Sequence, residues 1–179
     1  TMKVLQMMAL MLMASAMANA QRVPLHEQVH VPHPYYWREL YLPHVTSGPS
    51  SASWTRDGKN LVYAMAGSLW IQEGGTTTAR QLTAGDGYDF QPDCSPVSDE
   101  VVFVRYNGES MELMLLDLKA GTTSALTSNR QVNVEPRWSP DGTRLAFVST
   151  LVNGHFLIHV GKIQNLQLSG VVCVTPDRK

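Results

Sequence analysis

The sequence predicts an all-β protein, a partial β-propeller of about three four-stranded antiparallel blades preceded by a signal peptide. A ten-residue block occurs three times, beginning at Trp54, Cys94 and Trp138, so its starts lie 40 and then 44 residues apart. The segments within each copy are short, apolar and bounded by turn residues, a pattern that favours strands over helices. A repeat of about forty residues built from strands is typical of a propeller blade.

The block itself predicts a hairpin. Its clearest copy, residues 138–147, reads WSPDGTRLAF. Pro140 presets the backbone for a turn, Asp141 can bond back to nearby backbone, and Gly142 accepts a positive φ, so the chain should reverse there and continue as a buried strand. The first copy keeps the turn as Asp57-Gly58, whereas the second replaces it by Val97-Ser98 and is degenerate.

Two further segments complete each unit. Another apolar stretch follows the hairpin at 68–71, 111–117 and 156–160, and a similar pair closes the unit at Leu82-Thr83, Leu126-Thr127 and Val174-Thr175. The predicted blades are therefore 49–84, 88–128 and 133–175. Their aromatic and aliphatic positions are interpreted as core packing, because the inward face of a strand requires such residues.

The two ends of the chain are different in kind. Residues 1–20 combine Lys3, an apolar run and small residues of the A-x-A type before Gln21, which predicts a secretory signal peptide and an exported protein with no membrane span after cleavage. Residues 21–48 are predicted to be a proline- and histidine-rich linker or N-terminal strand. Residues 176–179 are expected to start a next, missing blade, so the chain is interpreted as an N-terminal fragment.

Two interpretations are possible for the histidines near the N-terminus, a metal site or a linker, and two for the cysteines, a disulfide or buried free thiols. His26, His30 and His33 have a spacing that could hold a metal, but nearby prolines disfavour a helix that would give them a common face, so a linker is preferred. His155 and His159 are expected to follow ordinary strand alternation without forming a site. Cys94 and Cys173 are expected to be buried small hydrophobes, with a disulfide as the alternative.

Catalytic and nucleic-acid signals are not found in the sequence. The chain carries 14 Lys and Arg against 15 Asp and Glu, which argues against a nucleic-acid partner. It contains no G-x-S-x-G, H-E-x-x-H or phosphate-binding glycine loop. Glu109, Glu112 and Asp117 are interpreted as solvated surface carboxylates. We therefore predict no catalytic, cofactor-binding or metal-binding residue in this segment, and no cofactor for it.

The block at 138–148 and the Leu-Thr pairs resemble the TolB-type (WD-like) propeller repeat over roughly residues 45–175. Other stretches are similar to the N-terminal propeller of exported amidohydrolases, namely 38–43 (RELYLP), 45–51 (VTSGPSS), 65–70 (MAGSLW), 87–93 (GYDFQPD) and 133–137 (NVEPR).

This resemblance implies a non-catalytic propeller that serves substrate access or interaction for a metal-dependent amidohydrolase. The hydrolase domain, acting on C–N bonds with a divalent metal such as zinc, would be the missing C-terminal domain of the same chain and its first partner. Two alternatives remain open. One is a TolB-like periplasmic propeller of the Tol system that binds protein or peptide ligands, and the other is the propeller of a prolyl-oligopeptidase-like peptidase.

Overall fold

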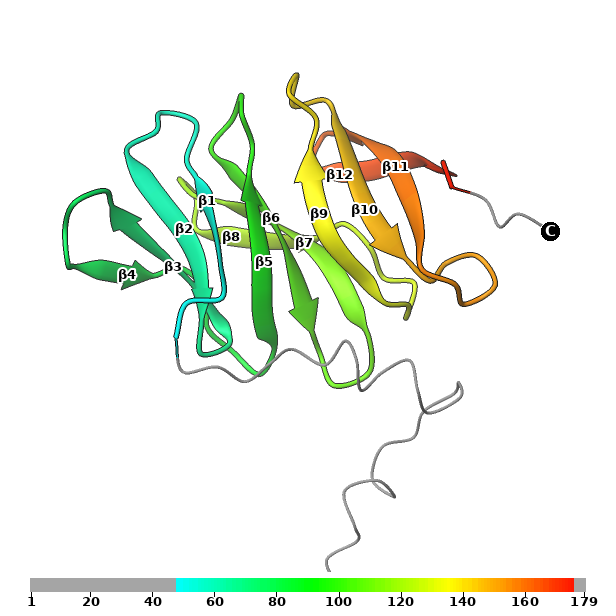
Figure 1. Ribbon diagram of the computed structural model, residues 1–179, viewed down its shortest axis with the longest axis horizontal. Coiled ribbons are helices and arrows are strands. Elements are labelled where there is room, and N and C mark those ends of the chain that lie inside the picture. The colour runs from blue at the N-terminus through cyan, green and yellow to red at the C-terminus, as the bar shows by residue number, and fades with distance from the viewer. Residues whose placement is uncertain (1–47, 176–179) are drawn as a thin grey trace, which may run out of the picture. The chain divides into compact units, whose positions relative to one another are not determined.

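The computed structural model describes residues 48–175, and all the regular elements in that range are strands. Twelve strands form three separate four-stranded antiparallel sheets, each made of strands consecutive in sequence (Figure 1). The predicted all-β fold and the predicted blade count are therefore confirmed. The signal peptide, most of the 21–48 linker and residues 176–179 lie outside the described residues.

Blade 1 consists of β1 (Ser51–Trp54), β2 (Asn60–Met65), β3 (Ser68–Glu73) and β4 (Ala79–Gln81). Its β1–β2 connection is the predicted turn, in which Gly58 has a φ of 67°. The Gly58 N–H donates to the Thr55 carbonyl at 2.8 Å and closes the reversal. The conformation explains why the turn needs a glycine, since other residues resist a positive φ.

Blade 2 consists of β5 (Tyr88–Cys94), β6 (Glu100–Tyr106), β7 (Met111–Asp117) and β8 (Thr122–Ala125). It is the central sheet, and β6 is apolar without interruption from Val101 to Val104, all four side chains being fully buried. A strand covered on both faces has no polar alternation, because neither set of side chains reaches water.

Blade 3 consists of β9 (Asn133–Trp138), β10 (Arg144–Ser149), β11 (Leu157–Gln164) and β12 (Gln167–Cys173). The predicted stretch at 156–160 overlaps the beginning of β11, which starts at Leu157 and runs four residues beyond the stretch. Here the fourth strand is longer than in the other blades, and it follows β11 through a tight turn in which Asn165 and Leu166 both have a positive φ.

The pair that closes each unit has one repeated structural role. The Thr83 hydroxyl accepts a hydrogen bond from Leu69 N–H at 2.9 Å, Thr127 does the same for Leu113 at 2.9 Å, and Thr175 for Ile158 at 2.8 Å. The preceding residue, Leu82, Leu126 or Val174, donates its N–H to the carbonyl of that same third-strand residue. The pair therefore lies just after the fourth strand. The sequence alone suggested that the pair was itself the last segment of the unit, and the structure places a separate fourth strand before it.

Apolar side chains fill the space between consecutive blades. We call the face that meets the following blade forward and the face that meets the preceding blade backward. One core joins the forward face of blade 1 to the backward face of blade 2, through Val62, Ala64, Leu69, Val101, Phe103 and Leu116. The second joins blades 2 and 3 in the same sense, through Val102, Val104, Leu113, Leu115, Leu145 and Phe147. Full burial of each of the Val, Leu and Phe side chains contributes about 1.5–3 kcal/mol.

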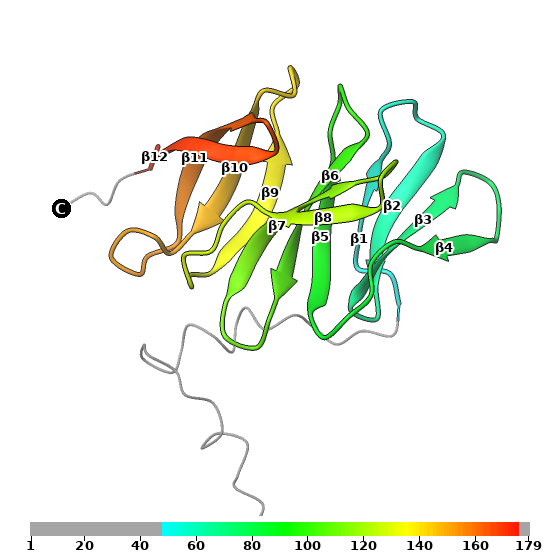
Figure 2. The same cartoon turned by 180° about the vertical axis from the view of Figure 1, so that it is seen from behind.

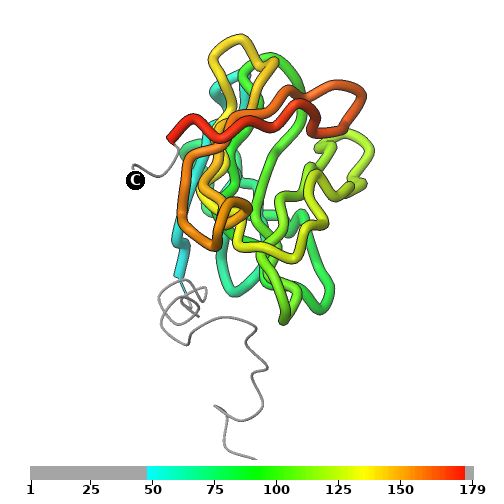
Figure 3. Tube along the Cα trace, turned by 90° about the vertical axis from the view of Figure 1, so that its right-hand side faces the viewer, coloured from blue at the N-terminus to red at the C-terminus, as the bar shows by residue number. Residues whose placement is uncertain are grey.

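The first strands β1, β5 and β9 are neighbours, with β5 in contact with both others. Figure 1 shows these strands in front, and Figure 2, seen from behind, brings β8 and β12 forward. Figure 3 gives the side view, with blade 3 in orange and red nearest the viewer. The sheets are thus arranged as propeller blades that contact one another mainly through their inner strands.

Candidate functional site at the blade junctions

Polar contacts of the described residues concentrate where blades meet. We call the end that carries the β1–β2, β5–β6 and β9–β10 turns the turn end. The opposite end carries the segments that link one blade to the next, 82–87 and 126–132, and we call it the linker end. Both ends hold charged side chains, and the inner strands between them hold a further set of contacts.

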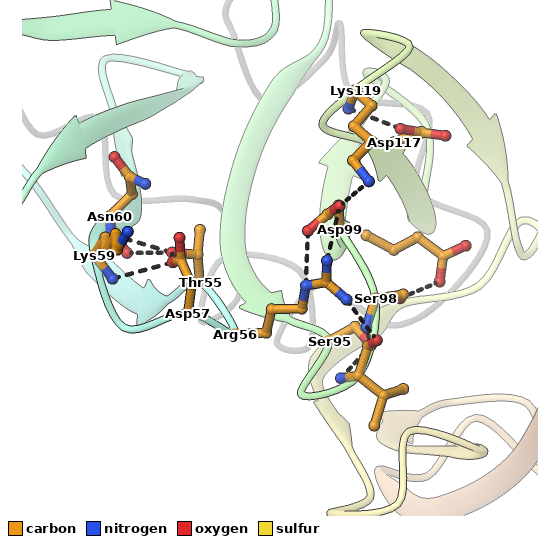
Figure 4. Close-up of polar contacts among 12 residues, drawn as sticks. Thr55, Arg56, Asp57, Lys59, Asn60, Ser95, Ser98, Asp99, Asp117 and Lys119 are labelled. Atoms are coloured by element: carbon orange, nitrogen blue, oxygen red, sulfur yellow. Dashed lines mark hydrogen bonds and ion pairs between the residues drawn. The ribbon is translucent and has the colours of Figure 1, made fainter.

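At the turn end, the aspartate of the repeat organises its own turn (Figure 4). Asp57 Oδ1 accepts hydrogen bonds from the Thr55 hydroxyl at 2.7 Å and from the Lys59 N–H at 3.1 Å. The Thr55 hydroxyl, with the Lys59 N–H, lowers the pKa of Asp57. In blade 3 the Ser139 hydroxyl, followed by Thr143, lowers the pKa of Asp141 to about 2.

The degenerate second copy closes its turn with a serine. Ser95 Oγ accepts the Val97 N–H at 3.3 Å and the Ser98 N–H at 3.2 Å. A serine hydroxyl can replace an aspartate carboxylate in this way, because both can accept from backbone two or three residues on. The replacement of Asp-Gly by Val97-Ser98 therefore leaves the hairpin intact.

A series of charged side chains links blade 1 to blade 2 at the turn end (Figure 4). Arg56 Nε lies 3.0 Å from Asp99 Oδ1, and Lys119 Nζ lies 2.7 Å from Asp99 Oδ2. Arg56 also donates to the Val97 carbonyl at 3.1 Å. The Lys119 ammonium, with Arg56, lowers the pKa of Asp99. Both carboxylate oxygens of Asp99 are thus engaged by cations, so its role here is to join two turns.

The inner strands carry a repeated contact that the sequence analysis missed. Ser53 and Asp93 both precede the first residue of the repeated block. Ser53 Oγ accepts the Cys94 N–H at 3.0 Å, and Asp93 Oδ2 accepts the Trp138 N–H at 2.8 Å. The Trp138 indole also donates to the Asp93 carbonyl at 3.1 Å. Each blade thus holds the inner strand of the next, and we call this contact the clasp.

Burial acts in the same direction on the two acidic groups near the inner strands. Burial raises the pKa of Asp93, although the Trp138 N–H acts against this, and burial raises the pKa of the Cys94 thiol to about 11. Cys94 is therefore an inert, buried thiol, as expected from its place in the repeat. Cys173 is only half-buried, and both cysteines are free, so the disulfide alternative is excluded.

The linker end holds a buried polar network centred on Glu112. Its carboxylate accepts hydrogen bonds from the Thr127 hydroxyl at 2.6 Å, the Arg130 N–H at 2.8 Å and the Ser110 hydroxyl at 2.9 Å. The interpretation of Glu112 as a solvated surface carboxylate was wrong, since only 7% of the residue is exposed. Glu109 is exposed as expected and pairs with Arg130, while Asp117 caps the β7–β8 turn through Lys119 and Ala120 N–H groups.

The network continues into blade 3 through Asn133, which is fully buried. Its amide donates to the Met111 carbonyl at 2.9 Å, and its Oδ1 accepts the Ser149 hydroxyl at 2.8 Å. Buried polar groups need such partners, because an unmade hydrogen bond costs roughly 1–3 kcal/mol. The arrangement occupies the carboxylate and amide fully and ties the 126–132 linker to both blades.

A bidentate ion pair lies at the same end in blade 2. Arg105 Nε and Nη2 donate to the two carboxylate oxygens of Asp89 at 2.7 and 2.8 Å. Asp89 is 2% exposed, and its N–H donates to the Gly67 carbonyl of blade 1. The ion pair lies within blade 2 and holds Asp89 in place, and the Asp89 backbone N–H links blade 2 to blade 1 at the linker end.

Of the histidines singled out in the sequence, His155 and His159 lie within the described residues. His26, His30 and His33 lie outside the described residues. His155 is exposed in the β10–β11 connection and not on a strand, whereas His159 is buried in β11. Within residues 48–175, no three His, Cys, Asp or Glu side chains gather as a metal site would need.

The described part of the chain is therefore a set of stacked propeller blades. No protein-family model matches it. It is similar to the uncharacterized peptidase YuxL of Bacillus subtilis (strain 168), 26% identical over 116 residues, covering 62% of this chain and 16% of the relative. It is also similar to the Tol-Pal system protein TolB of Gluconobacter oxydans (strain 621H), 29% identical over 87 residues, covering 49% and 19%.

Superposition on solved structures also indicates a propeller fold. TolB from Acinetobacter baumannii superposes with a TM-score of 0.59 at 22% identity, covering 68% of this chain and 31% of that one. A puromycin-hydrolyzing peptidase of Mycobacterium tuberculosis gives 0.55 at 20% identity, covering 72% and 22%. The fold is thus a TolB-like β-propeller fold, and the chain spans less than a fifth of the length of the curated relatives it matches. No helix of the described residues has the length and apolarity of a membrane span.

Proposed function

We propose that these blades are the non-catalytic propeller module of an exported hydrolase, controlling substrate access or binding a protein or peptide. The proposal rests on three carboxylates at and near the blade junctions, which all have hydrogen-bond or ion-pair partners within the protein. The Asp99 carboxylate links blade 1 to blade 2, the Glu112 carboxylate ties blade 2 to the linker that follows it, and the Asp89 carboxylate is held by Arg105 of its own blade. Carboxylates used in this way support a rigid scaffold whose loops are free to carry recognition.

The hydrolase that we propose first is a metal-dependent amidohydrolase. Its support is the resemblance of the 87–93 and 133–137 stretches to the propellers of that family. On this proposal, the residues described here bind no metal, and the C–N hydrolysis takes place in a C-terminal domain with its own divalent ion such as zinc.

Two alternatives have support of their own. The similarity to YuxL and to the puromycin-hydrolyzing peptidase favours a peptidase propeller. The similarity to TolB in both sequence and structure favours a protein-binding propeller of the Tol system. All three proposals share export, which rests on the signal peptide expected at residues 1–20.

Sequencing the gene beyond the Lys179 codon and assaying the full natural protein distinguish the three. The amidohydrolase predicts metal-binding histidines on barrel strands and hydrolysis of N-acyl amides that a chelator abolishes. A G-x-S-x-G motif with chelator-resistant peptide hydrolysis would overturn it in favour of the peptidase. A chain that ends after the propeller and hydrolyses neither substrate would favour the TolB-like alternative.

A further inference from the structure

Two asparagines of the sequence are followed by glycine, Asn107 in the β6–β7 turn and Asn153 in the β10–β11 connection. In such a pair the glycine nitrogen can attack the side-chain amide carbon of the asparagine, because glycine has no Cβ to obstruct the approach. The attack closes a five-membered ring and needs no enzyme. In a folded protein, its rate depends on how firmly the turn and the amide are held.

The Asn107 side chain is fixed by its own turn. The pairing of β6 with β7 reaches Tyr106 and Met111, so Asn107 begins a tight turn directly at the end of the ladder. Its N–H donates to the Ser110 carbonyl at 3.2 Å. Its side-chain Oδ1 accepts the Glu109 N–H at 3.0 Å and the Ser110 N–H at 2.8 Å. The amide carbon is therefore held by two hydrogen bonds that must break before the glycine nitrogen can attack it.

The Asn153 side chain is exposed, and within the described part of the chain no hydrogen bond holds it. The pairing of β10 with β11 ends at Ser149 and Leu157, and the connection extends beyond this ladder as the orange loop of Figure 1. A backbone hydrogen bond closes its turn, from the His155 N–H to the Val152 carbonyl at 3.1 Å. Opening the turn frees the Asn153 amide, since no bond to the side chain must break with it.

The backbone of the second turn is the one that an Asn-Gly pair favours. Asn153 and Gly154 have φ values of 53° and 72°, so both central residues are left-handed, as in a type I′ turn. Closing the five-membered ring requires Asn153 to rotate out of this conformation. The rate therefore follows the fraction of time for which the turn is open, and that fraction is larger where fewer bonds hold the turn.

We propose that Asn153 is a site of spontaneous deamidation and that Asn107 is protected from it. The Gly154 nitrogen loses its proton to hydroxide and bonds to the Asn153 amide carbon, and the amide nitrogen takes up a proton from water and leaves as ammonia. Water then opens the cyclic imide at either carbonyl and gives aspartate or isoaspartate. The product adds one carboxylate to a chain of formal net charge -1. This inference does not depend on the proposed function.

Ageing the full chain in weakly alkaline buffer compares the two sites within one molecule. Trypsin releases them on separate peptides, residues 106–119 and 145–162, and mass spectrometry follows the loss of each amide. The proposal predicts that Asn153 deamidates at least about tenfold faster than Asn107, because two additional hydrogen bonds hold the Asn107 amide. Equal rates, or a faster reaction at Asn107, would overturn the proposal.

Unfolding the chain in guanidinium chloride provides the control for the role of the fold. Both turns are lost there, so the two Asn-Gly pairs should deamidate at similar rates. A difference between the sites that persisted in the unfolded chain would come from the local sequence and would overturn the structural argument. An Asn153 that reacts in the unfolded chain but not in the folded chain would show that its turn protects it, and would also overturn the proposal.

The product distinguishes ring closure from direct hydrolysis of the amide, which gives aspartate alone. Peptide 145–162 of the aged protein should contain isoaspartate, detected with a protein-isoaspartate methyltransferase and a labelled methyl donor. The Asn153→Asp variant, tested before ageing, is the matched control, because it carries the new charge in an ordinary backbone and should not be labelled there. Aspartate as the sole product of ageing would overturn the proposed attack by Gly154.

Discussion

Individual residues at the turns show how the same repeat tolerates different sequences. Gly58 and Gly142 share a φ of 67°, but their surroundings differ. A Cβ at Gly58 would meet nothing within 4 Å, whereas a Cβ at Gly142 would lie 2.2 Å from Val97 Cγ2 of blade 2. The blade 3 turn thus presses on the degenerate turn of blade 2, and its glycine is needed for space as well as for conformation.

The first prediction compares these two glycines. Gly58→Ala should cost about 1–2 kcal/mol, the strain of a positive φ. Gly142→Ala should cost roughly 1–3 kcal/mol more, because the added methyl meets the stiff Val97 side chain. Urea unfolding of both variants measures the difference. Repeating Gly142→Ala in a Val97→Ala background should remove the excess, and an excess that persists would show that the contact is not its cause.

The second prediction concerns acid. The pKa of Asp141 is lowered from 3.8 to about 2, so the folded state binds fewer protons than the unfolded state between those values. Its stabilising effect is therefore complete above the unfolded pKa and is lost as the pH falls toward 2. Thermal melts from pH 5 to pH 2 should show a shallower loss for Asp141→Asn than for the natural protein. Parallel curves would rule out this contribution.

Other carboxylates also contribute to the change of thermal stability with pH in that experiment. The pKa values of Asp57 and Asp99 are also lowered, and both groups remain in the variant, so they preserve part of the acid sensitivity. The raised pKa of Asp93 acts in the opposite sense, because the folded state then holds a proton that the unfolded state releases. Its contribution is largest at low pH and is lost as the pH rises through the folded pKa.

At the scale of elements, the blade junction at the linker end depends on polar contacts within an apolar core. Glu112 is the third-strand residue between Met111 and Leu113, and it accepts hydrogen bonds from Ser110 in the β6–β7 turn and from Thr127 and Arg130 in the 126–132 linker. Since two of those donors belong to the linker, the network fixes how blade 2 leads into blade 3.

The third prediction removes the charge of this carboxylate. Glu112→Gln places an amide N–H against groups that donate, and should destabilise the protein by about 1–3 kcal/mol. Glu109→Gln is the matched control, because its ion pair with Arg130 is largely exposed and should contribute at most about 1 kcal/mol. Guanidinium unfolding of both variants makes the comparison. Equal losses would contradict the structural role assigned to Glu112.

The sequence predicted elements that depend on local chemistry and missed contacts that depend on neighbours. The turn at Asp141-Gly142 and the strand after it follow from the residues themselves. Glu112 could not be recognised as buried, because its partners Thr127 and Arg130 lie fifteen and eighteen residues away. The clasp at Ser53 and Asp93 could have been suspected from their shared place in the repeat, but three different residue types at that position conceal it.

At the scale of the whole folded unit, stacking determines the behaviour of each blade. Blade 2 is covered on both faces and has a continuous apolar β6, whereas each outer blade has one face that lacks this cover. Whether an apolar side chain is buried therefore depends on the neighbouring blade and not on strand propensity. The stability of every blade depends on its neighbours in the same way.

Hydrogen exchange at three backbone amides tests this stacking most directly. Cys94, Glu135 and Trp138 each donate an N–H to a side chain of the preceding blade, Ser53, Gln91 and Asp93 respectively. The stacked blades predict that all three exchange together and at least ~100-fold more slowly than in the unfolded chain. Rapid exchange at these amides, with the ladders inside each sheet still protected, would show that the sheets fold without stacking and would contradict the propeller.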